Sequence, residues 1–303
     1  MKSDQHLVTN GWEGYELLDS GENMKLERFG EVVVARPETQ ALWAKLKPEL
    51  WGSAHALFAF RDSKGSWEVK KQIPDVWEVP LGSVTCLARL TGFKHVGIFP
   101  EQEPNWKWVA EQCRTLRSRV GTLSERGEEA RDTAPKVLNL FGYTGAASLV
   151  AAHSGGLVTH VDSSKQSLDW AHENARRSKL GEDKIRWILD DALAFVKREA
   201  RRGAKYDGII LDPPAFGRGA KGEVWKIEED LPKLLEALKG LLSEKLGSFF
   251  LLNGYAAGYA PLSFVQAVES VFGNVLGESG ELRIQESQTN RAIPAGIYVR
   301  FVR

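Results

Sequence analysis

A glycine-rich turn follows a buried strand in the second half of the chain. Within the run Phe141-Gly142-Tyr143-Thr144-Gly145, two glycines let the backbone curve tightly and approach a ligand without a Cβ in the way. The helix expected to begin at Ala146 offers free N–H groups to a carboxylate or a phosphate. The two glycines stand three residues apart, which departs from the G-x-G-x-x-G spacing of dinucleotide sites. We therefore expect a smaller anion at this turn than a pyrophosphate.

Acidic residues end the next two predicted strands. Asp162 comes 17 residues after Gly145, near the spacing at which nucleotide-binding folds place an acid that accepts both hydroxyls of a ribose. Asp191 precedes Ala192 at the end of the following strand and can accept from an adenine amino group. Aspartate is also favoured at a helix N-cap, so Asp191 could serve there instead. The two roles are compatible.

The fourth strand of this series ends in Asp212-Pro213-Pro214-Ala215-Phe216. Prolines fix φ and remove N–H donors, which leaves rigid carbonyl groups exposed. Asp212 and the carbonyl of Pro213 can accept hydrogen bonds from an amino group, and the ring of Phe216 can stack on a base. The alternative is an ordinary stiff turn. The place of the Asp212 motif at the end of the fourth parallel strand favours a functional role.

Strand–helix alternation from residue 136 onward must position these motifs. The pattern predicts strands over 137–141, 156–161, 185–189, 206–211, 248–252, 279–286 and 297–302, most of them separated by helices. Repeated βα units require a parallel sheet with helices on both faces. Ligands of such sheets bind at the carboxyl ends of the strands, near the point where the strand order reverses. All four motifs stand at that edge.

The sequence divides into three predicted parts: a small α+β domain over 1–98, a helix and linker over 99–135, and an α/β domain over 136–303. Within the first part we expect several short strands, among them 94–99, and a helix over 40–47. No catalytic signature lies inside it. Residues 121–135 are polar and rich in Glu and Arg, as in a connecting segment.

Composition narrows the class of protein. The chain has 303 residues with 40 basic and 40 acidic side chains, so its net charge argues against holding nucleic acid by bulk electrostatics. No run approaches 18 apolar residues and the start lacks an apolar signal segment, so we expect no membrane association. Two cysteines are typical of the reducing cytoplasm. The histidines show no metal-ligand spacing, and we expect no metal.

Taken in order, the strand-end motifs resemble those of the class I S-adenosylmethionine-dependent methyltransferases. The resemblance implies a Rossmann-like sheet of seven strands with a small N-terminal α+β domain, and S-adenosylmethionine as cofactor. It assigns the cofactor site to residues of the four motifs, namely Asn139, Phe141, Gly142, Tyr143, Thr144, Gly145, Asp162, Ser163, Asp191, Ala192 and Asp212.

A closer likeness is to bacterial proteins related to the large-subunit ribosomal RNA cytosine-5 methyltransferases. It is carried by the run Phe99-Pro100-Glu101-Gln102, by the glycine turn, and by the Asp212 motif with its continuation Gly217-Arg218-Gly219. The resemblance adds Phe99 and Gln102 to the cofactor site and implies RNA, namely ribosomal RNA, as partner. We find no room before Gly14 for the family's N-terminal PUA domain, which we expect to be missing.

One departure from that family bears on the reaction. The cytosine-5 enzymes attack the base with a cysteine thiolate placed just after the fifth strand. Here the corresponding run, 252–258, contains no cysteine, and we interpret Cys86 and Cys113 as small buried hydrophobic residues. We therefore expect direct in-line transfer to an RNA nucleobase, with Asp212, Pro213 and Phe216 as the catalytic residues.

Several alternatives stay open. The neutral net charge would also suit a methyltransferase that acts on a protein or a small molecule, and a non-catalytic cofactor-binding protein is a further possibility. Trp225 could close over the acceptor or pack in the core. Arg291 could contact a phosphate or lie at a solvated hairpin tip. The sequence leaves homo-oligomer formation undecided.

Overall fold

The computed structural model describes residues 2–61, 64–121, 134–219, 222–255 and 258–303. They form two compact units, each assembled from segments that lie far apart in sequence. The first unit contains residues 1–7, 105–281 and 296–303, and the second contains 8–104 and 282–295. The division expected from sequence used contiguous ranges instead. Most of the predicted linker, 122–133, lies outside the described residues.

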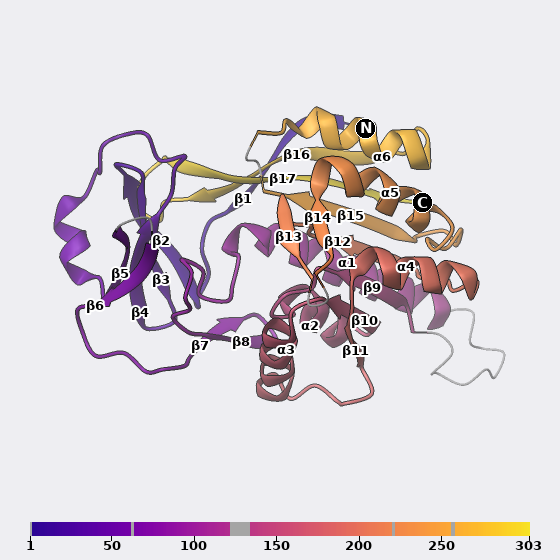
Figure 1. Cartoon of the computed structure of the whole chain (residues 1–303), viewed down its shortest axis with the longest axis horizontal. Coiled ribbons are helices and arrows are strands. Elements are labelled where there is room, and N and C mark those ends of the chain that lie inside the picture. Colours follow the sequence, from indigo (N-terminus) through magenta and orange to yellow (C-terminus); the bar gives the residue numbers. More distant parts are fainter. Residues whose placement is uncertain (1, 62–63, 122–133, 220–221, 256–257) are drawn as a thin grey trace. The chain divides into compact units, whose positions relative to one another are not determined.

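A single large sheet organises the first unit (Figure 1). Its order is β1-β16-β17-β15-β12-β9-β10-β11. The strands are β1 (Lys2–Thr9), β9 (Lys136–Leu140), β10 (Leu157–Asp162), β11 (Ile185–Leu189), β12 (Gly208–Leu211), β15 (Phe249–Gly254), β16 (Gly277–Gln285) and β17 (Ala292–Val302). Strands β9 to β12 and β15 run parallel, and β17 is antiparallel to β15. The class I methyltransferase-like α/β sheet is thus confirmed, with β1 as an eighth strand beside the seven expected.

Helices cover both faces of this sheet. They are α1 (Glu103–Gly121), α2 (Ala146–His153), α3 (Lys165–Arg177), α4 (Ala192–Arg201), α5 (Ile227–Lys239) and α6 (Pro261–Phe272). Because side chains alternate along a strand, Leu138 and Leu140 pack in the core formed with α4, α5 and α6. Asn139, between them, reaches Ser148 of α2 on the opposite face. None of the helices within the described ranges has the length and apolar character needed to cross a membrane.

The strand order reverses beside β9. This strand pairs with β10 on one side and with β12 on the other, in parallel on both. The chain proceeds outward through β10 and β11, and then returns to β12 and β15 on the other side of β9. The crevice outside the carboxyl ends of β9 and β12 is therefore the topological switch point, where open α/β sheets bind ligands.

The second unit is mostly β-structure. A five-stranded sheet has the order β2 (Tyr15–Gly21), β3 (Met24–Phe29), β4 (Val32–Pro37), β5 (Ala56–Arg61) and β6 (Lys64–Val69), and a hairpin is formed by β7 (Trp77–Leu81) and β8 (Val84–Ala88). Two short 3₁₀ helices, η1 (Pro48–Ser53) and η2 (Pro100–Gln102), complete it. The helix predicted over 40–47 and the strand predicted over 94–99 are both wrong, since neither segment is regular.

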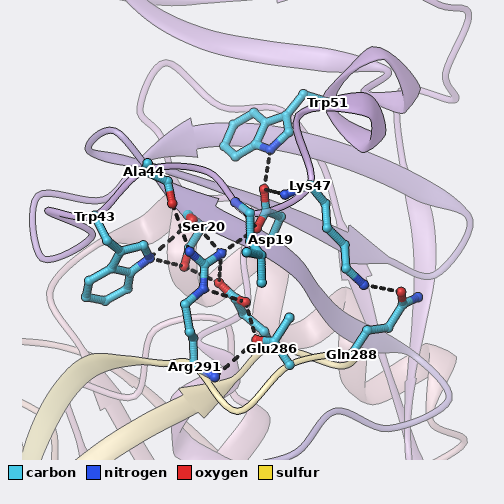
Figure 2. A network of polar contacts seen from close by, with 11 residues as sticks. Asp19, Ser20, Trp43, Ala44, Lys47, Trp51, Glu286, Gln288 and Arg291 are labelled. Atoms are coloured by element: carbon cyan, nitrogen blue, oxygen red, sulfur yellow. Dashed lines mark hydrogen bonds and ion pairs between the residues drawn. The ribbon is translucent and has the colours of Figure 1, made fainter.

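A buried polar network explains why residues 40–47 form no helix (Figure 2). The fully buried carboxylate of Asp19 accepts from the backbone N–H of Leu46 at 3.2 Å and of Lys47 at 3.1 Å. It also accepts from Nε1 of Trp51 at 2.7 Å. The two backbone N–H groups donate to a side chain distant in sequence and not to the carbonyls four residues earlier, so the segment does not form a helix.

Arg291 completes this network (Figure 2). Its Nη2 donates to Oδ1 of Asp19 at 2.6 Å, and its Nε donates to Oε2 of Glu286 at 3.0 Å. The same guanidinium also donates to the backbone carbonyls of Ser20 and Ala44. Both interpretations of Arg291 from sequence are wrong, because its donors serve two buried carboxylates and it lies neither free for phosphate nor at a solvated tip.

Candidate functional site

A hollow opens at the carboxyl ends of the first unit's parallel strands. It is lined by residues that follow four different strands, namely Phe141, Val161, Asp162, Ser163, Asp190, Asp191, Ala192, Pro214, Gly217, Arg218, Gly219, Glu223 and Trp225. Five residues assigned to the cofactor from sequence, Phe141, Asp162, Ser163, Asp191 and Ala192, are therefore brought together. Tertiary structure gathers them because the carboxyl ends of parallel strands share one edge of the sheet.

The turn after β9 has an alternating backbone conformation. Phe141, Tyr143 and Gly145 have φ values of 58°, 51° and 91°, whereas Gly142 and Thr144 lie outside the left-handed region. For residues with a Cβ this conformation costs about 1–2 kcal/mol each. The N–H groups of Gly142 and Gly145 donate to the carbonyls of Val161 and Gly142, and the N–H of Tyr143 donates to Asp162. The N–H groups open to an anion beside this turn are therefore those of the first turn of α2, which have no partner within the helix. Strain concentrated at one strand end marks this turn as a candidate functional element.

A buried polar chain supports the turn from behind. Nδ2 of Asn139 donates to Oγ of Ser148 at 2.8 Å, and that hydroxyl lies 2.9 Å from Nδ1 of His160. Burial lowers the pKa of His160 to about 3, so its imidazole is neutral. The hydroxyl of Ser148 can either donate to Nδ1 of the neutral ring or accept from it, according to the tautomer of His160. The side chain of Asn139 thus supports α2 and does not line the hollow.

Thr144 and Gly142 also have structural duties in the turn. The carbonyl of Thr144 accepts from Nδ2 of Asn174 at 2.8 Å, which ties the turn to α3. A Cβ on Gly142 would lie 2.4 Å from Cε1 of His160, so only glycine fits against this ring. Neither residue is among those that line the hollow.

Asp162 faces the hollow at the end of β10. Its Oδ2 accepts from the N–H of Tyr143 and its Oδ1 from the N–H of Ser164, both at 2.8 Å. Burial raises the pKa of this carboxyl, and the two N–H donors partly oppose that rise. Each oxygen keeps a further lone pair, so the carboxylate can also accept hydrogen bonds from hydroxyl groups of a ligand.

Two adjacent carboxylates end β11. Oδ1 of Asp191 accepts from the N–H of Ala194 at 2.8 Å, which confirms it as the N-cap of α4. Asp190 accepts from the N–H of Asp191 at 3.0 Å and pairs with Arg198. Both residues line the hollow, so Asp191 caps α4 and also forms part of the hollow's wall. Asp190 was missed, although its position in the same strand-end doublet was a usable signal.

A short hairpin follows the Asp212 motif and closes one side of the hollow. It is formed by β13 (Phe216–Arg218) and β14 (Val224–Lys226). Nε1 of Trp225 donates to the carbonyl of Pro214 at 2.7 Å, and its ring lies 4.8 Å from that of Phe141. Trp225 therefore packs in the core and also lines the hollow.

Two of the proposed catalytic residues, Asp212 and Pro213, directly follow β12, and the third, Phe216, begins the hairpin as the first residue of β13. Asp212 is half-buried, Pro213 is buried, and Phe216 is 56% exposed. They are not among the residues that line the hollow, and neither are Tyr143 and Gly145. Their catalytic and binding roles stay predictions.

The remaining predicted residues lie elsewhere. Phe99 and Gln102 belong to the second unit, and their part in the cofactor site stays a prediction. Cys86 and Cys113 are buried, as expected, and burial raises the pKa of each thiol to about 12. In the described part of the chain, no group of three or more His, Cys, Asp or Glu side chains could hold a metal ion.

Comparisons with known proteins identify the family. No protein-family model matches the chain. A solved structure of a SAM-dependent methyltransferase from Agrobacterium tumefaciens is 38% identical, covers 98% of this chain and 93% of its own, and superposes with a TM-score of 0.88. The structure of SMU.776 complexed with SAH is 19% identical, with a TM-score of 0.70 over 96% of this chain and 76% of that one, which indicates a shared fold.

Curated relatives match a smaller part of the chain. The ribosomal RNA large subunit methyltransferase K/L of Alteromonas mediterranea is 31% identical over 194 residues, which is 63% of this chain and 24% of that protein. The corresponding protein of Syntrophotalea carbinolica is 30% identical over 187 residues, 60% of this chain and 23% of that protein. The chain thus spans about a quarter of the length of the curated relatives it matches.

The chemistry of the hollow fits S-adenosylmethionine (SAM). Four carboxylates line it, those of Asp162, Asp190, Asp191 and Glu223. The adenosyl part of SAM offers hydroxyl and amino donors, and its sulfonium is a cation, so acceptors and negative charge are the complementary groups. The chain belongs to the SAM-dependent methyltransferases, and SAM is its cofactor.

Proposed function

We propose that the chain transfers the methyl group of SAM to a nucleobase nitrogen of RNA, namely ribosomal RNA, by direct in-line displacement. The observation that carries this proposal is the Asp212-Pro213-Pro214 motif at the end of β12, beside the switch point and the carboxylate-lined hollow. The K/L relatives are named as methyltransferases of large-subunit ribosomal RNA, which supports an RNA acceptor.

Within this proposal, each strand end binds a different part of the cofactor. Asp162 accepts the ribose hydroxyls, for which both of its oxygens are already oriented by backbone N–H groups at 2.8 Å. Asp191, fixed by its own capping bond, accepts the adenine amino group. The N–H groups at the start of α2, just after the strained turn of Phe141 to Gly145, receive the anionic end of the methionine moiety.

The chain's catalytic contribution is then alignment and charge stabilisation. Bound SAM supplies an electrophilic methyl group whose C–S bond breaks as the bond to the acceptor nitrogen forms, with the sulfur leaving as a neutral thioether. Asp212 and the carbonyl of Pro213 orient the acceptor amine and disperse the positive charge that develops on it before its proton is lost. The exposed ring of Phe216 stacks against the base.

The chemistry of the two thiols supports transfer without a covalent enzyme intermediate. Nucleophilic attack by cysteine needs the thiolate. Cys86 and Cys113 are the chain's two cysteines, and burial raises the pKa of each to about 12, which keeps them protonated. Attack by an acceptor nitrogen requires no such group.

The experiment is methyl transfer from labelled SAM into three pools: unmodified ribosomal RNA, protein, and small-molecule extract. Asp212→Ala is compared with the wild type, and Asp169→Ala, which removes an exposed carboxylate paired with Lys165, is the control. We expect label in RNA that falls at least about 10²-fold in Asp212→Ala, with cofactor affinity retained and the control unaffected.

Each other outcome identifies the failing step. Label confined to protein or small molecules would overturn the RNA acceptor but not the site. Label in RNA that persists in Asp212→Ala would remove the catalytic role of this residue. Absence of label in every pool despite tight SAM binding would favour a cofactor-binding protein without activity on these acceptors.

A further inference from the structure

The register of the hairpin formed by β13 and β14 gives it two chemically different faces. Its register pairs Gly217 with Trp225, and Arg218 with Val224. Side chains alternate along each strand and paired residues share a face. Gly217 and Trp225 therefore lie on the side that closes the hollow. The opposite, outer face carries Phe216, Arg218, Val224 and Lys226, and the side chain of Arg218 also reaches the rim of the hollow, which it helps to line.

This outer face is exposed although half of it is apolar. Phe216 is 56% exposed and Val224 is 50% exposed, and both cations beside them are exposed as well. An aromatic ring flanked by cations is the combination with which proteins bind single-stranded nucleic acid, since the ring stacks on a base and the cation contacts the backbone phosphates. Stacking of this kind is worth about 1–3 kcal/mol per base.

Arg218 differs from the other cations near this edge. Lys165 is paired with Asp169, Arg198 with Asp190, Lys226 with Glu229, and Lys233 with Asp230. Arg218 is exposed at the rim of a hollow lined by four carboxylates, yet within the described ranges it forms no ion pair or hydrogen bond. Its guanidinium is thus available to an anion from outside the chain.

The cofactor does not supply that anion. The rim at Arg218 belongs to the hollow that contains Asp162 and Asp191, to which the proposed function assigns the adenosyl part. Adenosine carries no anionic group, and the proposed function assigns the carboxylate of the methionine moiety to the start of α2. The complementary anion must then be part of the acceptor, and phosphate is the anion that RNA provides.

We propose that the outer face of this hairpin binds the acceptor RNA strand, with Arg218 contacting a backbone phosphate next to the base that stacks on Phe216. This inference rests on the proposed function. A bidentate guanidinium at this place fixes the strand without reading its sequence.

The test compares Arg218→Ala, Arg218→Lys and the control Lys165→Ala, which removes an exposed, carboxylate-paired cation at the start of α3. For Arg218→Ala we expect KM for ribosomal RNA to rise about 10-fold, with kcat and the SAM dissociation constant unchanged. The slope of log affinity against log salt should become shallower by about 0.7–0.9, the loss of one phosphate contact. Arg218→Lys should keep this slope while losing part of the affinity, and the control should match the wild type.

The contrary results are separable. Wild-type methylation of RNA together with an unchanged KM and salt slope in Arg218→Ala would overturn this inference alone. A higher SAM dissociation constant in Arg218→Ala would assign the residue to cofactor binding, and this result would also overturn the inference. Absence of RNA methylation by the wild type would overturn the proposed function, and the hairpin's role with it.

Discussion

The backbone N–H of Tyr143 donates a hydrogen bond of 2.8 Å to Oδ2 of Asp162, which joins the turn after β9 to the end of β10. The other oxygen of this carboxylate holds the N–H of Ser164, just before α3. One side chain therefore organises two adjacent strand ends and faces the hollow between them. The cofactor role that we propose for this side chain depends on the same two oxygens as its structural role.

Asp162→Ala should weaken SAM binding by on the order of 1.5–3 kcal/mol, because it removes charge-assisted acceptors for the ribose hydroxyls. Isothermal titration with SAM measures this directly, and Asp169→Ala, an exposed acid on α3, is the control. Burial raises the pKa of Asp162, and the protonated form loses acceptor capacity. Affinity of the wild type should therefore fall as the pH is lowered toward this raised pKa, and the variant should lack that dependence. Equal affinities of variant and wild type would reject the assignment.

The first unit was largely predictable because its signals are local. Parallel strands buried on both faces give short continuous apolar runs, and Ser164 and Asp191 cap the helices that follow two of them. The eighth strand, β1, was not predicted, since its polar sequence carries no strand alternation and its place depends on pairing with β16, far along the chain. The helix predicted over 40–47 is wrong for a similar reason, because backbone N–H groups of this segment donate to the distant side chain of Asp19.

The site residues that stand at strand ends could be predicted from the sequence, whereas those whose position depends on strand register or on the hairpin could not. Asp162 and Asp191 are found at positions that the fold makes chemically useful, and both line the hollow. Nothing in the local sequence indicates that the side chain of Asn139 points toward α2. Its direction depends on the strand register and on the hydrogen bond to Ser148. Glu223 enters the wall through the hairpin, a pairing that local sequence did not indicate.

Gly142→Ala should destabilise the fold by about 1–3 kcal/mol, the usual cost of overpacking. The new Cβ would lie 2.4 Å from Cε1 of His160, whose ring is held by Ser148. Urea unfolding followed by tryptophan fluorescence measures the change. Gly240→Ala, where a Cβ meets nothing within 4 Å and the backbone is helical, should be neutral or slightly stabilising. In a double-mutant cycle with His160→Ala, the double variant should be less destabilised than the sum of the two single variants, and additive effects would refute the clash.

Arg291→Ala should destabilise the second unit by about 3 kcal/mol, near the lower end of the cost of breaking a buried ion pair, because the arginine side chain is itself 25% exposed. Its loss leaves the carboxylates of Asp19 and Glu286 buried without their cation (Figure 2). Arg28→Ala, which breaks a pair with the more exposed Glu16, should cost about 1 kcal/mol or less. Unfolding midpoints in urea decide between them, and similar losses in the two variants would show that burial does not set the cost.

Glu27 should make the stability of the second unit depend on pH in the acid range. Its carboxylate is fully buried, receives two hydrogen bonds from Arg36 at 2.5 and 3.0 Å, and lies 3.7 Å from Nζ of Lys25. Burial raises its pKa, but the charges of Arg36 and Lys25 outweigh that effect and lower the pKa from 4.5 to about 2. A depressed pKa means that the unfolded chain binds the proton more readily than the folded one. The stabilisation is therefore complete above the unfolded value and is lost as the pH falls from about 5 toward 2.

Urea unfolding of the wild type at pH 7, 5 and 3 should show this loss, in comparison with Glu27→Gln. The variant should be less stable at pH 7, because Arg36 is then buried without its carboxylate, and its stability should vary less between pH 5 and 3 because the titrating group is gone. Glu16→Gln, in a pair whose side chains are more than a quarter exposed, should leave the acid dependence unchanged. If Glu27→Gln lost stability with acid as steeply as the wild type, other groups would have to account for the slope.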